Sequence, residues 1–496
     1  MISRAALLPL DSRPCNTKYP DYISKIAGID LLLPPKELLG DIKHPGNHER
    51  LVRWLENVVP EVDILILSID MLVFGGLVRS RKHDSSFGEA MSRLKLLSKI
   101  RKHNPHLKIY AFSIIMRLSV TAEDKKSAEY CRDIFEYSKI ARSSKKDDIK
   151  RVDCLRKRIP REVLEDYLKT RQRNHEINRV AVEVLADGDI DHLVLGVEDS
   201  SEQGLHEGEK ENLQRMIEKR DVSGKAGIVT GADELSSLLI CRAKTSESVK
   251  RPKVFVKYLD ERGARIVSLY EDKSIDEVVT DHIELAGVEA CYSDYESDLI
   301  LFVNTPIKSQ PDLFLAKPSK KKVDERIFDE VNNEKVYEKP FAVADVKYCN
   351  GADAGFVPQL LKNVDLSRIV SFSGFNTTAN SVGIVLAHSI SFLLSERNES
   401  TLRYHREFLL YSLANDYLYQ AVVRPEIIEH LKSEGMSIFD ISSGYAEADY
   451  LLKEKMVERK EELLDPLLRS GSLELKNIMF PWKRIFEIDM DVKFSV

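Results

Sequence analysis

The stretch that decides the fold runs from Ile64 to Arg81 and reads ILILSIDMLVFGGLVRSR. Its first part is a continuous apolar run, and such runs are typical of strands that are buried on both faces of a parallel sheet. Asp70 follows the run at once, and two glycines separate it from Arg79 and Arg81. The stretch therefore predicts a buried strand that ends in a carboxylate and leads into a loop with two arginines.

Similar short runs alternate with longer amphipathic stretches along the chain. We expect strands at Ala5–Leu10, Leu31–Leu33, Ile64–Ile69, Ile109–Ile115, Leu193–Val197, Gly227–Thr230, Val254–Leu259, Leu299–Val303, Ala342–Val346 and Ile369–Phe372. We expect amphipathic helices at Asn47–Val59, Glu89–Lys102, Arg161–Leu185, Gly208–Lys219 and Ala232–Ala243. This alternating order predicts an α/β fold of mostly parallel strands with flanking helices.

The chain is long enough to form several domains. Its 496 residues exceed what one hydrophobic core normally supports. A polar stretch at Lys244–Lys253 suggests a boundary between an α/β domain at 1–245, with an incomplete (β/α) barrel as one option, and a smaller α/β domain at 250–398. No β pattern is recognised past Ser389, so 399–496 is expected to be mainly helical. Those helices are candidates for a cap or for a homo-oligomer interface.

Composition argues against several classes of function. The net charge of −6 gives no electrostatic footprint for nucleic acid or for an anionic membrane surface. The six cysteines include no CxxC pair, which argues against zinc and redox motifs and favours reduced thiols in the cytoplasm. The apolar run at the N-terminus is too short for a signal peptide, and no stretch approaches the roughly 20 apolar residues of a membrane span. We therefore expect a cytoplasmic protein that acts on a small molecule.

Polar side chains gather where the predicted strands end. In α/β folds these loops carry the ligand sites, because the strands stop there and helix N-termini point in. The residues placed there are Asp11, Arg13, Asp70, Arg79, Arg81, Arg117, Glu198, Asp199, Asp233, Glu234, Asp345, Asn376 and Asn380. Asp233 and Glu234 are explained equally well as a helix cap. The adjacent pair of Glu198 and Asp199 is harder to explain structurally and is the first choice for catalysis.

Two further segments offer hydrogen-bonding groups. Arg171, Asn174 and Asn178 share one face of a predicted helix, which suits hydroxyl or carboxylate ligands, with a solvated outer face as the alternative. The segment Gly374–Gly383, GFNTTANSVG, opens an apolar helix after a strand. Its backbone N–H groups are suited to an oxyanion or a sugar hydroxyl.

Several familiar motifs are missing from the sequence. We find no GxxxxGK[ST], no GxGxxG after a strand, no GxSxG and no HExxH. The twelve histidines show no ligand spacing, and we interpret His206 and His388 as incidental. Nucleotide, nicotinamide, serine-hydrolase and zinc chemistry all lose support, and no cofactor is expected under the leading hypothesis.

The combined motifs resemble a known family. The segments LLPLDSRPCN, PPKELLG, SIDMLVFGGLVRSR, LGVEDSSEQGL, GADE and SGFNTTANSVG occur in this order over residues 5 to 383. Together they resemble a bacterial domain-of-unknown-function family that is typified by an LPLDSRP opening. The resemblance implies no particular activity. The fifth-strand motif of that family usually has two aspartates, so Glu198 departs from it by one methylene group.

Three functional hypotheses follow. The first is a glycoside hydrolase acting on a small saccharide, with Glu198 and Asp199, together with Asp233 or Glu234, as acid and base. The second is a Mg²⁺- or Mn²⁺-dependent phosphatase or isomerase with an all-oxygen site. Its ligands would be Asp11, Asp70, Glu198, Asp199 and Asp345. The third is a non-catalytic sugar- or acid-binding protein.

Overall fold

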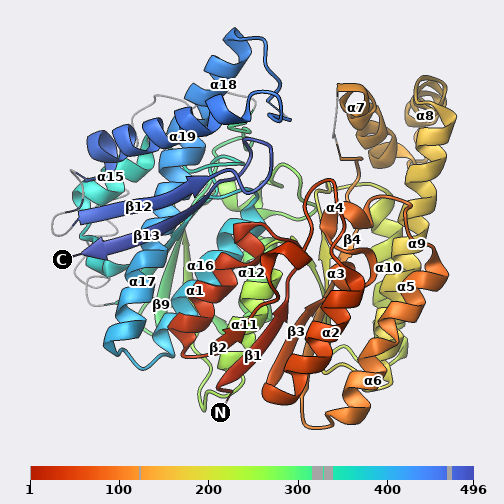
Figure 1. The fold of residues 1–496 in the computed structure, drawn as a ribbon, viewed down its shortest axis with the longest axis horizontal. Helices are drawn as coiled ribbons and strands as arrows, with labels where there is room; N and C mark the ends of the chain where they lie inside the picture. The colour runs from red at the N-terminus through yellow and green to blue at the C-terminus, as the bar shows by residue number, and fades with distance from the viewer. Residues whose placement is uncertain are drawn as a thin grey trace. The chain divides into compact units, whose positions relative to one another are not determined.

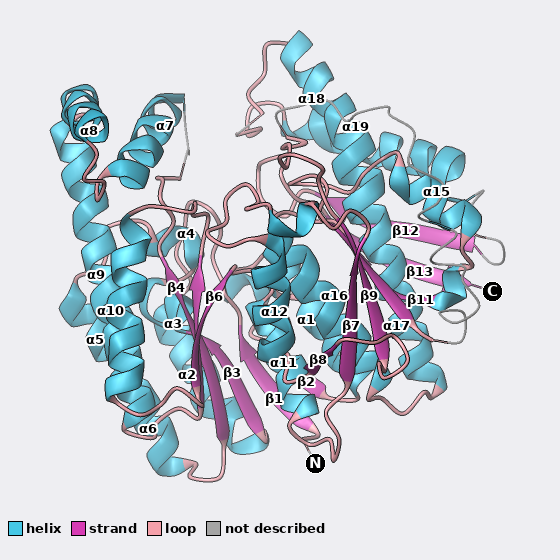
Figure 2. Ribbon diagram, turned by 180° about the vertical axis from the view of Figure 1, so that it is seen from behind, coloured by secondary structure: helices cyan, strands magenta, loops and turns pink. Residues whose placement is uncertain are grey.

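The protein folds into two compact units, each with its own parallel sheet and flanking helices (Figure 1, Figure 2). The computed structural model describes residues 2–121, 125–314, 328, 339–438, 440–465, 468 and 472–495. The first unit comprises Met1–Thr17, Ile29–Leu239 and Tyr270–Lys273. The second comprises Lys18–Gly28, Ile240–Leu269 and Ser274–Val496. The predicted α/β class is confirmed.

The first unit contains a six-stranded sheet in the order β2-β1-β3-β4-β5-β6, with every neighbouring pair parallel. Its strands are β1 (Arg4–Leu8), β2 (Asp30–Leu32), β3 (Ile64–Ser68), β4 (Lys108–Ile115), β5 (His192–Val197) and β6 (Ala226–Thr230). Each lies within two residues of its predicted position. Every residue of β3 and β5 is buried, as expected for strands that are covered by helices on both faces.

Helices cover this sheet and supply its connections. They are α2 (His48–Val58), α3 (Ile69–Phe74), α4 (Leu77–Ser80), α5 (Phe87–Leu94), α6 (Leu96–His103), α7 (Lys125–Ile140), α8 (Lys146–Arg158), α9 (Arg161–Ala186) and α10 (Leu205–Lys219). The single helix predicted at Glu89–Lys102 is divided between α5 and α6. Helix α11 (Leu235–Thr245) begins in the first unit and ends in the second.

The second unit repeats the winding order of the first. Its sheet has the order β11-β10-β9-β7-β8, again with parallel neighbours. The strands are β7 (Lys253–Tyr258), β8 (Glu289–Cys291), β9 (Leu299–Asn304), β10 (Phe341–Asp345) and β11 (Ile369–Ser373). In each sheet the first strand pairs with both the second and the third, so the order in which strands are added reverses there: between β1 and β3 in the first sheet and between β7 and β9 in the second. Open α/β sheets usually bind ligands at such a point. The short, partly exposed β8 was not predicted because it has no apolar run.

Helices and a hairpin complete the second unit. The helices are α1 (Lys18–Ala27), α12 (Ile275–Leu285), α15 (Phe356–Asn363), α16 (Thr378–Leu393), α17 (Glu399–Ser412), α18 (Arg424–Ser433) and α19 (Tyr445–Arg459), with π-helical turns at Leu413–Val423 and Lys460–Leu464. The region after 399 is mainly helical, as expected. The prediction that strands end before it is wrong, because β12 (Ser472–Met479) and β13 (Asp489–Ser495) pair antiparallel. Both alternate between buried and exposed residues, a weaker signal than a continuous apolar run.

The first sheet is open. Strands β2 and β6 are its edges and do not pair, so the barrel considered for this part of the chain does not form. Yet Arg13, after β1, makes a 2.5 Å ion pair with Asp233, after β6. Four strand spacings of about 4.8 Å would separate these loops by roughly 19 Å in a flat sheet. The segments that follow β1 and β6 therefore approach each other over the carboxyl edge of the sheet.

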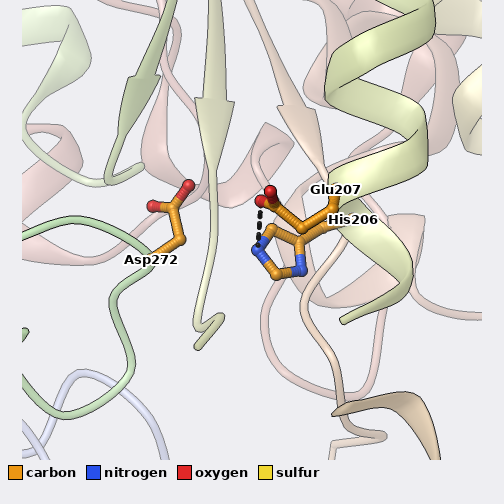
Figure 3. Close-up of side chains that lie close together, drawn as sticks. All are labelled: His206, Glu207 and Asp272. Atoms are coloured by element: carbon orange, nitrogen blue, oxygen red, sulfur yellow. Dashed lines mark ion pairs between the residues drawn. The ribbon is translucent and has the colours of Figure 1, made fainter. Parts of the chain in front are cut away.

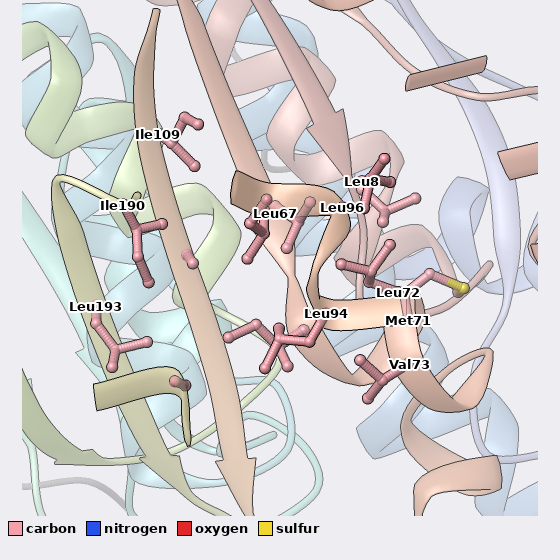
Figure 4. Packing of buried hydrophobic residues seen from close by; sticks show 14 of the residues in the cluster. Leu8, Leu67, Met71, Leu72, Val73, Leu94, Leu96, Ile109, Ile190 and Leu193 are labelled. Carbon is pink, nitrogen blue, oxygen red and sulfur yellow. The ribbon is translucent and has the colours of Figure 1, made fainter. Parts of the chain in front are cut away.

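One core of apolar side chains fixes the strand ends of the first unit. It includes Leu8 of β1, Leu67 of β3, Leu72 of α3, Ile109 of β4 and Leu193 of β5, all almost fully buried (Figure 4). Because these strands pack through continuous apolar surfaces, the polar residues that follow them are held at one edge of the sheet.

A close approach between β5 and β6 gives a test of this packing. A side chain at Gly196 would place its Cβ 2.5 Å from the carbonyl oxygen of Gly231, whereas a Cβ at Gly227 meets no atom within 4 Å. We expect Gly196→Ala to lower the free energy of unfolding by about 1–3 kcal/mol through overpacking. The matched variant Gly227→Ala is expected to be neutral or slightly stabilising. Urea denaturation of both variants measures the difference, and equal stabilities would contradict the close approach.

Candidate functional site

Four charged side chains form what we call the carboxylate–arginine cluster: Glu198, Asp199, Arg81 and Arg117. Glu198 and Asp199 directly follow β5, Arg81 ends α4, and Arg117 follows β4. Arg81 bonds Glu198, and Nη2 of Arg117 lies 2.5 Å from Oδ2 of Asp199. Arg81 also donates to the hydroxyl of Thr121 at 2.7 Å. The structure thus brings together four of the residues predicted at the strand ends.

The two carboxylates of this cluster have unequal surroundings. The side chain of Glu198 is 7% exposed and that of Asp199 is 27% exposed. Burial raises the pKa of Glu198, and the charge of Asp199 adds to this, while Arg81 and Arg117 oppose it. Asp199 has a positive φ of 28°, which is unusual for a residue other than glycine and places it in a strained turn. The cluster therefore has one buried and one partly exposed carboxylate, and such a difference suits general acid–base catalysis.

Asp70 lies beside this cluster in α3 rather than at the end of β3. It is fully buried, and Oδ2 accepts a 2.9 Å hydrogen bond from the backbone N–H of Ile114. Burial raises the pKa of Asp70 to about 7; the Ile114 bond opposes this, and the nearby charge of Glu198 adds to it. Asp70 therefore interacts electrostatically with the cluster and is not placed to contact a ligand directly.

Arg13 forms a second, closed network. Its guanidinium donates to the carboxylates of Asp11 and Asp233. The distance is 2.7 Å from Nη2 to Asp11 and 3.0 Å from Nη1 to Asp233. Asn16 donates to the same two carboxylates at 3.0 Å. All four side chains are nearly inaccessible. Because their hydrogen-bonding groups are directed at one another, this network joins the loops after β1 and β6 instead of facing a ligand.

The polar face of α9 is buried against the sheet. Arg171 donates to the carbonyl of Met116 at 2.7 Å and is paired with Glu209 at 2.7 Å. Asn174 and Asn178 donate to backbone carbonyls of residues 80 and 114. These groups fasten the helix to the end of β4, to α4 and to α10, so neither a solvated face nor an open ligand face describes them.

The remaining residues predicted in the first unit have local partners. Arg79 lies in α4 rather than in a loop, and it pairs with the exposed Asp84. Glu234 is fully buried and accepts a hydrogen bond from the backbone of Ala232 at 3.2 Å. Both therefore have structural roles at the edge of the sheet.

The second unit holds the other predicted residues. Asp345 is fully buried and accepts bonds from Asn304 at 2.9 Å and from the backbone of Asp353 at 2.7 Å. Burial, with the charge of Asp353, raises its pKa to about 7. Asn376 has a positive φ of 61°, and the side-chain amide of Asn380 donates at 3.1 Å to the hydroxyl of Thr377, the N-cap residue of α16. These residues form a separate polar edge in their own unit.

A third polar group was not predicted from the sequence, because its members lie far apart in the chain. His206 and Glu207 are in the first turn of α10, and Asp272 belongs to the segment Tyr270–Lys273 (Figure 3). Their possible metal-ligating atoms lie within 4.8 Å of one another. The all-oxygen set proposed for Mg²⁺ or Mn²⁺ includes Asp345, which belongs to the other unit.

In the part of the chain that the structure describes, no helix combines the length and apolar character needed to cross a membrane.

The Arg13 network predicts a large loss of stability on substitution. Arg13→Met leaves two buried carboxylates without their shared cation, and we expect a loss of about 3–5 kcal/mol in the free energy of unfolding. Arg4→Met removes ion pairs with Asp30 and Glu61 between side chains that are exposed to solvent, and we expect a much smaller loss, because water screens such pairs. Chemical denaturation compares them; similar losses would contradict the network's role.

Asp70 predicts a pH dependence of stability. Its folded pKa of about 7 lies above the unfolded value, so its contribution is complete below about pH 4 and is lost as the pH rises towards 7. Asp70→Asn removes this titration and keeps an oxygen for Ile114. The variant is therefore expected to gain stability relative to the wild type between about pH 4 and 7. Asp63→Asn is the control in which the pKa shift has the opposite sign, because backbone hydrogen bonds lower the pKa of Asp63. Denaturation curves across this range that show no relative gain would refute the assignment.

Comparison with known proteins places the chain in a family. The model of one family, described as "Protein of unknown function (DUF4127)", matches residues 5–491. No curated protein and no solved structure matches the chain. The expected membership of a domain-of-unknown-function family is thereby confirmed. Since the match spans nearly the whole sequence, the chain belongs to the DUF4127 family of proteins of unknown function.

Proposed function

We propose that this protein is a cytoplasmic glycoside hydrolase that acts on a small saccharide at the carboxylate–arginine cluster. The observation that carries the proposal is the contrast between Glu198, which is buried with a raised pKa, and its neighbour Asp199, whose side chain is 27% exposed. Glycoside hydrolysis needs one carboxyl that holds a proton and a second that stays charged near the sugar. The six cysteines are free thiols, in keeping with a reducing compartment.

Glu198 serves as the general acid in this mechanism. Its proton passes to the glycosidic oxygen while the bond from that oxygen to the anomeric carbon breaks. Arg81 pairs with Glu198 in the resting protein, and the same guanidinium stabilises the carboxylate that remains after proton transfer. A water molecule then attacks the anomeric carbon, and Glu198 takes up the proton of that water.

The adjacency of the two carboxyls favours a substrate-assisted route on a 2-acetamido sugar. In this route the acetamido oxygen forms a bond to the anomeric carbon as the leaving group departs. The attack of water on the anomeric carbon then breaks this bond and restores the acetamido group. Asp199 accepts a hydrogen bond from the acetamido N–H and balances the positive charge that develops. Arg117, at 2.5 Å, holds the Asp199 carboxylate in position. Asp233 and Glu234 are less suitable partners, because their carboxylates are engaged by Arg13 and by the backbone.

Paired substitutions test these roles. With nitrophenyl glycosides, Glu198→Gln is expected to lower kcat by roughly 10²- to 10⁴-fold, and less for a dinitrophenyl leaving group, which needs little protonation. Asp199→Asn is expected to affect 2-acetamido substrates more than substrates with a 2-hydroxyl group. Glu202→Gln, an exposed neighbour in the same loop, is the matched control and is expected to retain activity.

Two results would count against the proposal. One is the absence of turnover by the purified wild-type protein across aryl glycosides and disaccharides of both kinds. The other is hydrolysis that Glu198→Gln leaves unchanged whatever the leaving group, because Glu198 would then not be the acid.

A further inference from the structure

The N-terminal end of α10 carries side chains of the kinds that hold transition metals. The ligating atoms of His206, Glu207 and Asp272 lie within 4.8 Å of one another. Two ligands bonded to one ion at about 2.1 Å are at most about 4.2 Å apart. A bound ion therefore requires only a small inward movement of side chains that already converge.

His206 is the most informative member of this group. Its side chain is 1% exposed, and Nε2 lies 3.2 Å from Oε1 of Glu207 without forming a hydrogen bond. Buried polar atoms nearly always have a partner, so this nitrogen points to a ligand. Gly204 makes room for the ring, because a Cβ at this position would come within 2.9 Å of Nδ1 of His206.

Asp272 is held in place by groups outside the site. Its side chain has no exposed surface, and Oδ1 accepts a 2.6 Å hydrogen bond from the hydroxyl of Thr230, the last residue of β6. The segment that carries Asp272 is fixed by a 2.9 Å bond from the N–H of Ser200 to the carbonyl of Tyr270. Such outer contacts orient the first ligands of metal sites.

A cation already occupies this position. The ammonium of Lys210 lies 2.9 Å from Oε1 of Glu207 and also bonds Asp272. The two carboxylates thus converge on a positive charge. The Lys210 side chain is 18% exposed, so its ammonium has access to water if another cation replaces it.

We propose that His206, Glu207 and Asp272 bind one divalent transition-metal ion, which exchanges with the ammonium of Lys210. The imidazole nitrogen favours Zn²⁺ or Mn²⁺ over Mg²⁺ and Ca²⁺, which prefer oxygen ligands. Three protein ligands leave a position for water. The ion links α10 to the segment Tyr270–Lys273. This site is separate from the carboxylate–arginine cluster, and its test does not depend on catalysis.

Calorimetric titration of the full chain, without a polyhistidine tag, tests the exchange. ZnCl₂, MnCl₂ and MgCl₂ are titrated into the wild type, Lys210→Met and the control Lys219→Met, an exposed lysine of the same helix. We expect one Zn²⁺ or Mn²⁺ per chain and roughly tenfold or tighter binding to Lys210→Met, with Mg²⁺ weak in every case. The control is expected to match the wild type.

Second substitutions identify the ligands. In the Lys210→Met background, His206→Ala and Asp272→Asn are each expected to weaken Zn²⁺ binding by roughly 10- to 100-fold or more. Visible absorption of Co²⁺ bound to Lys210→Met is expected to show a nitrogen ligand, and His206→Ala to remove that signature. Binding to Lys210→Met no tighter than to the wild type would overturn the proposal. So would Zn²⁺ binding that survives His206→Ala, since the ion would then lie elsewhere.

Discussion

The forked ion pair of Arg13 with Asp11 and Asp233 is the interaction on which the first unit depends. It joins the loop after β1 to the loop after β6, across a sheet in which these strands are four positions apart. The three side chains are buried, so the guanidinium compensates two carboxylates that have little water around them. This contact links two loops at the carboxyl edge of the sheet, the edge at which the carboxylate–arginine cluster also lies.

The carboxyl edge of the first sheet holds two groups of charged side chains, the Arg13 network and the carboxylate–arginine cluster, which differ in their charge balance. In the Arg13 network the guanidinium of Arg13 and the amide of Asn16 both donate to Asp11 and Asp233. In the carboxylate–arginine cluster each carboxylate has a guanidinium partner, but Asp199 and Arg117 retain exposed surface. Asp70 lies beside the cluster, and its burial raises its pKa to about 7. An open carboxylate beside one that tends to keep its proton is the arrangement on which the proposed hydrolysis rests.

The sequence predicted the framework well and the contacts less well. Continuous apolar runs such as ILILS and LILFV located the central strands, because burial on both faces leaves an unambiguous pattern. The hairpin of β12 and β13 was missed, because a half-buried strand alternates and resembles polar loop sequence. The rule that ligand sites follow strand ends brought Glu198, Asp199, Arg81 and Arg117 into one group. It did not show that Asp11 and Asp233 share one guanidinium, since a contact between residues 220 positions apart leaves no local signal in the sequence. His206 looked incidental for a similar reason, because Asp272 approaches it only through tertiary structure.

The central claim concerns the protonation of Glu198. The most direct measurement is the titration of its side-chain carboxyl carbon by NMR in protein labelled at glutamate, with Glu198→Gln to assign the signal. A midpoint above the ordinary value of about 4.3 is predicted, because burial and the charge of Asp199 outweigh the two arginines. A midpoint below that value would mean that Arg81 keeps the carboxyl ionised, and Glu198 would then be a structural partner of Arg81 and not an acid.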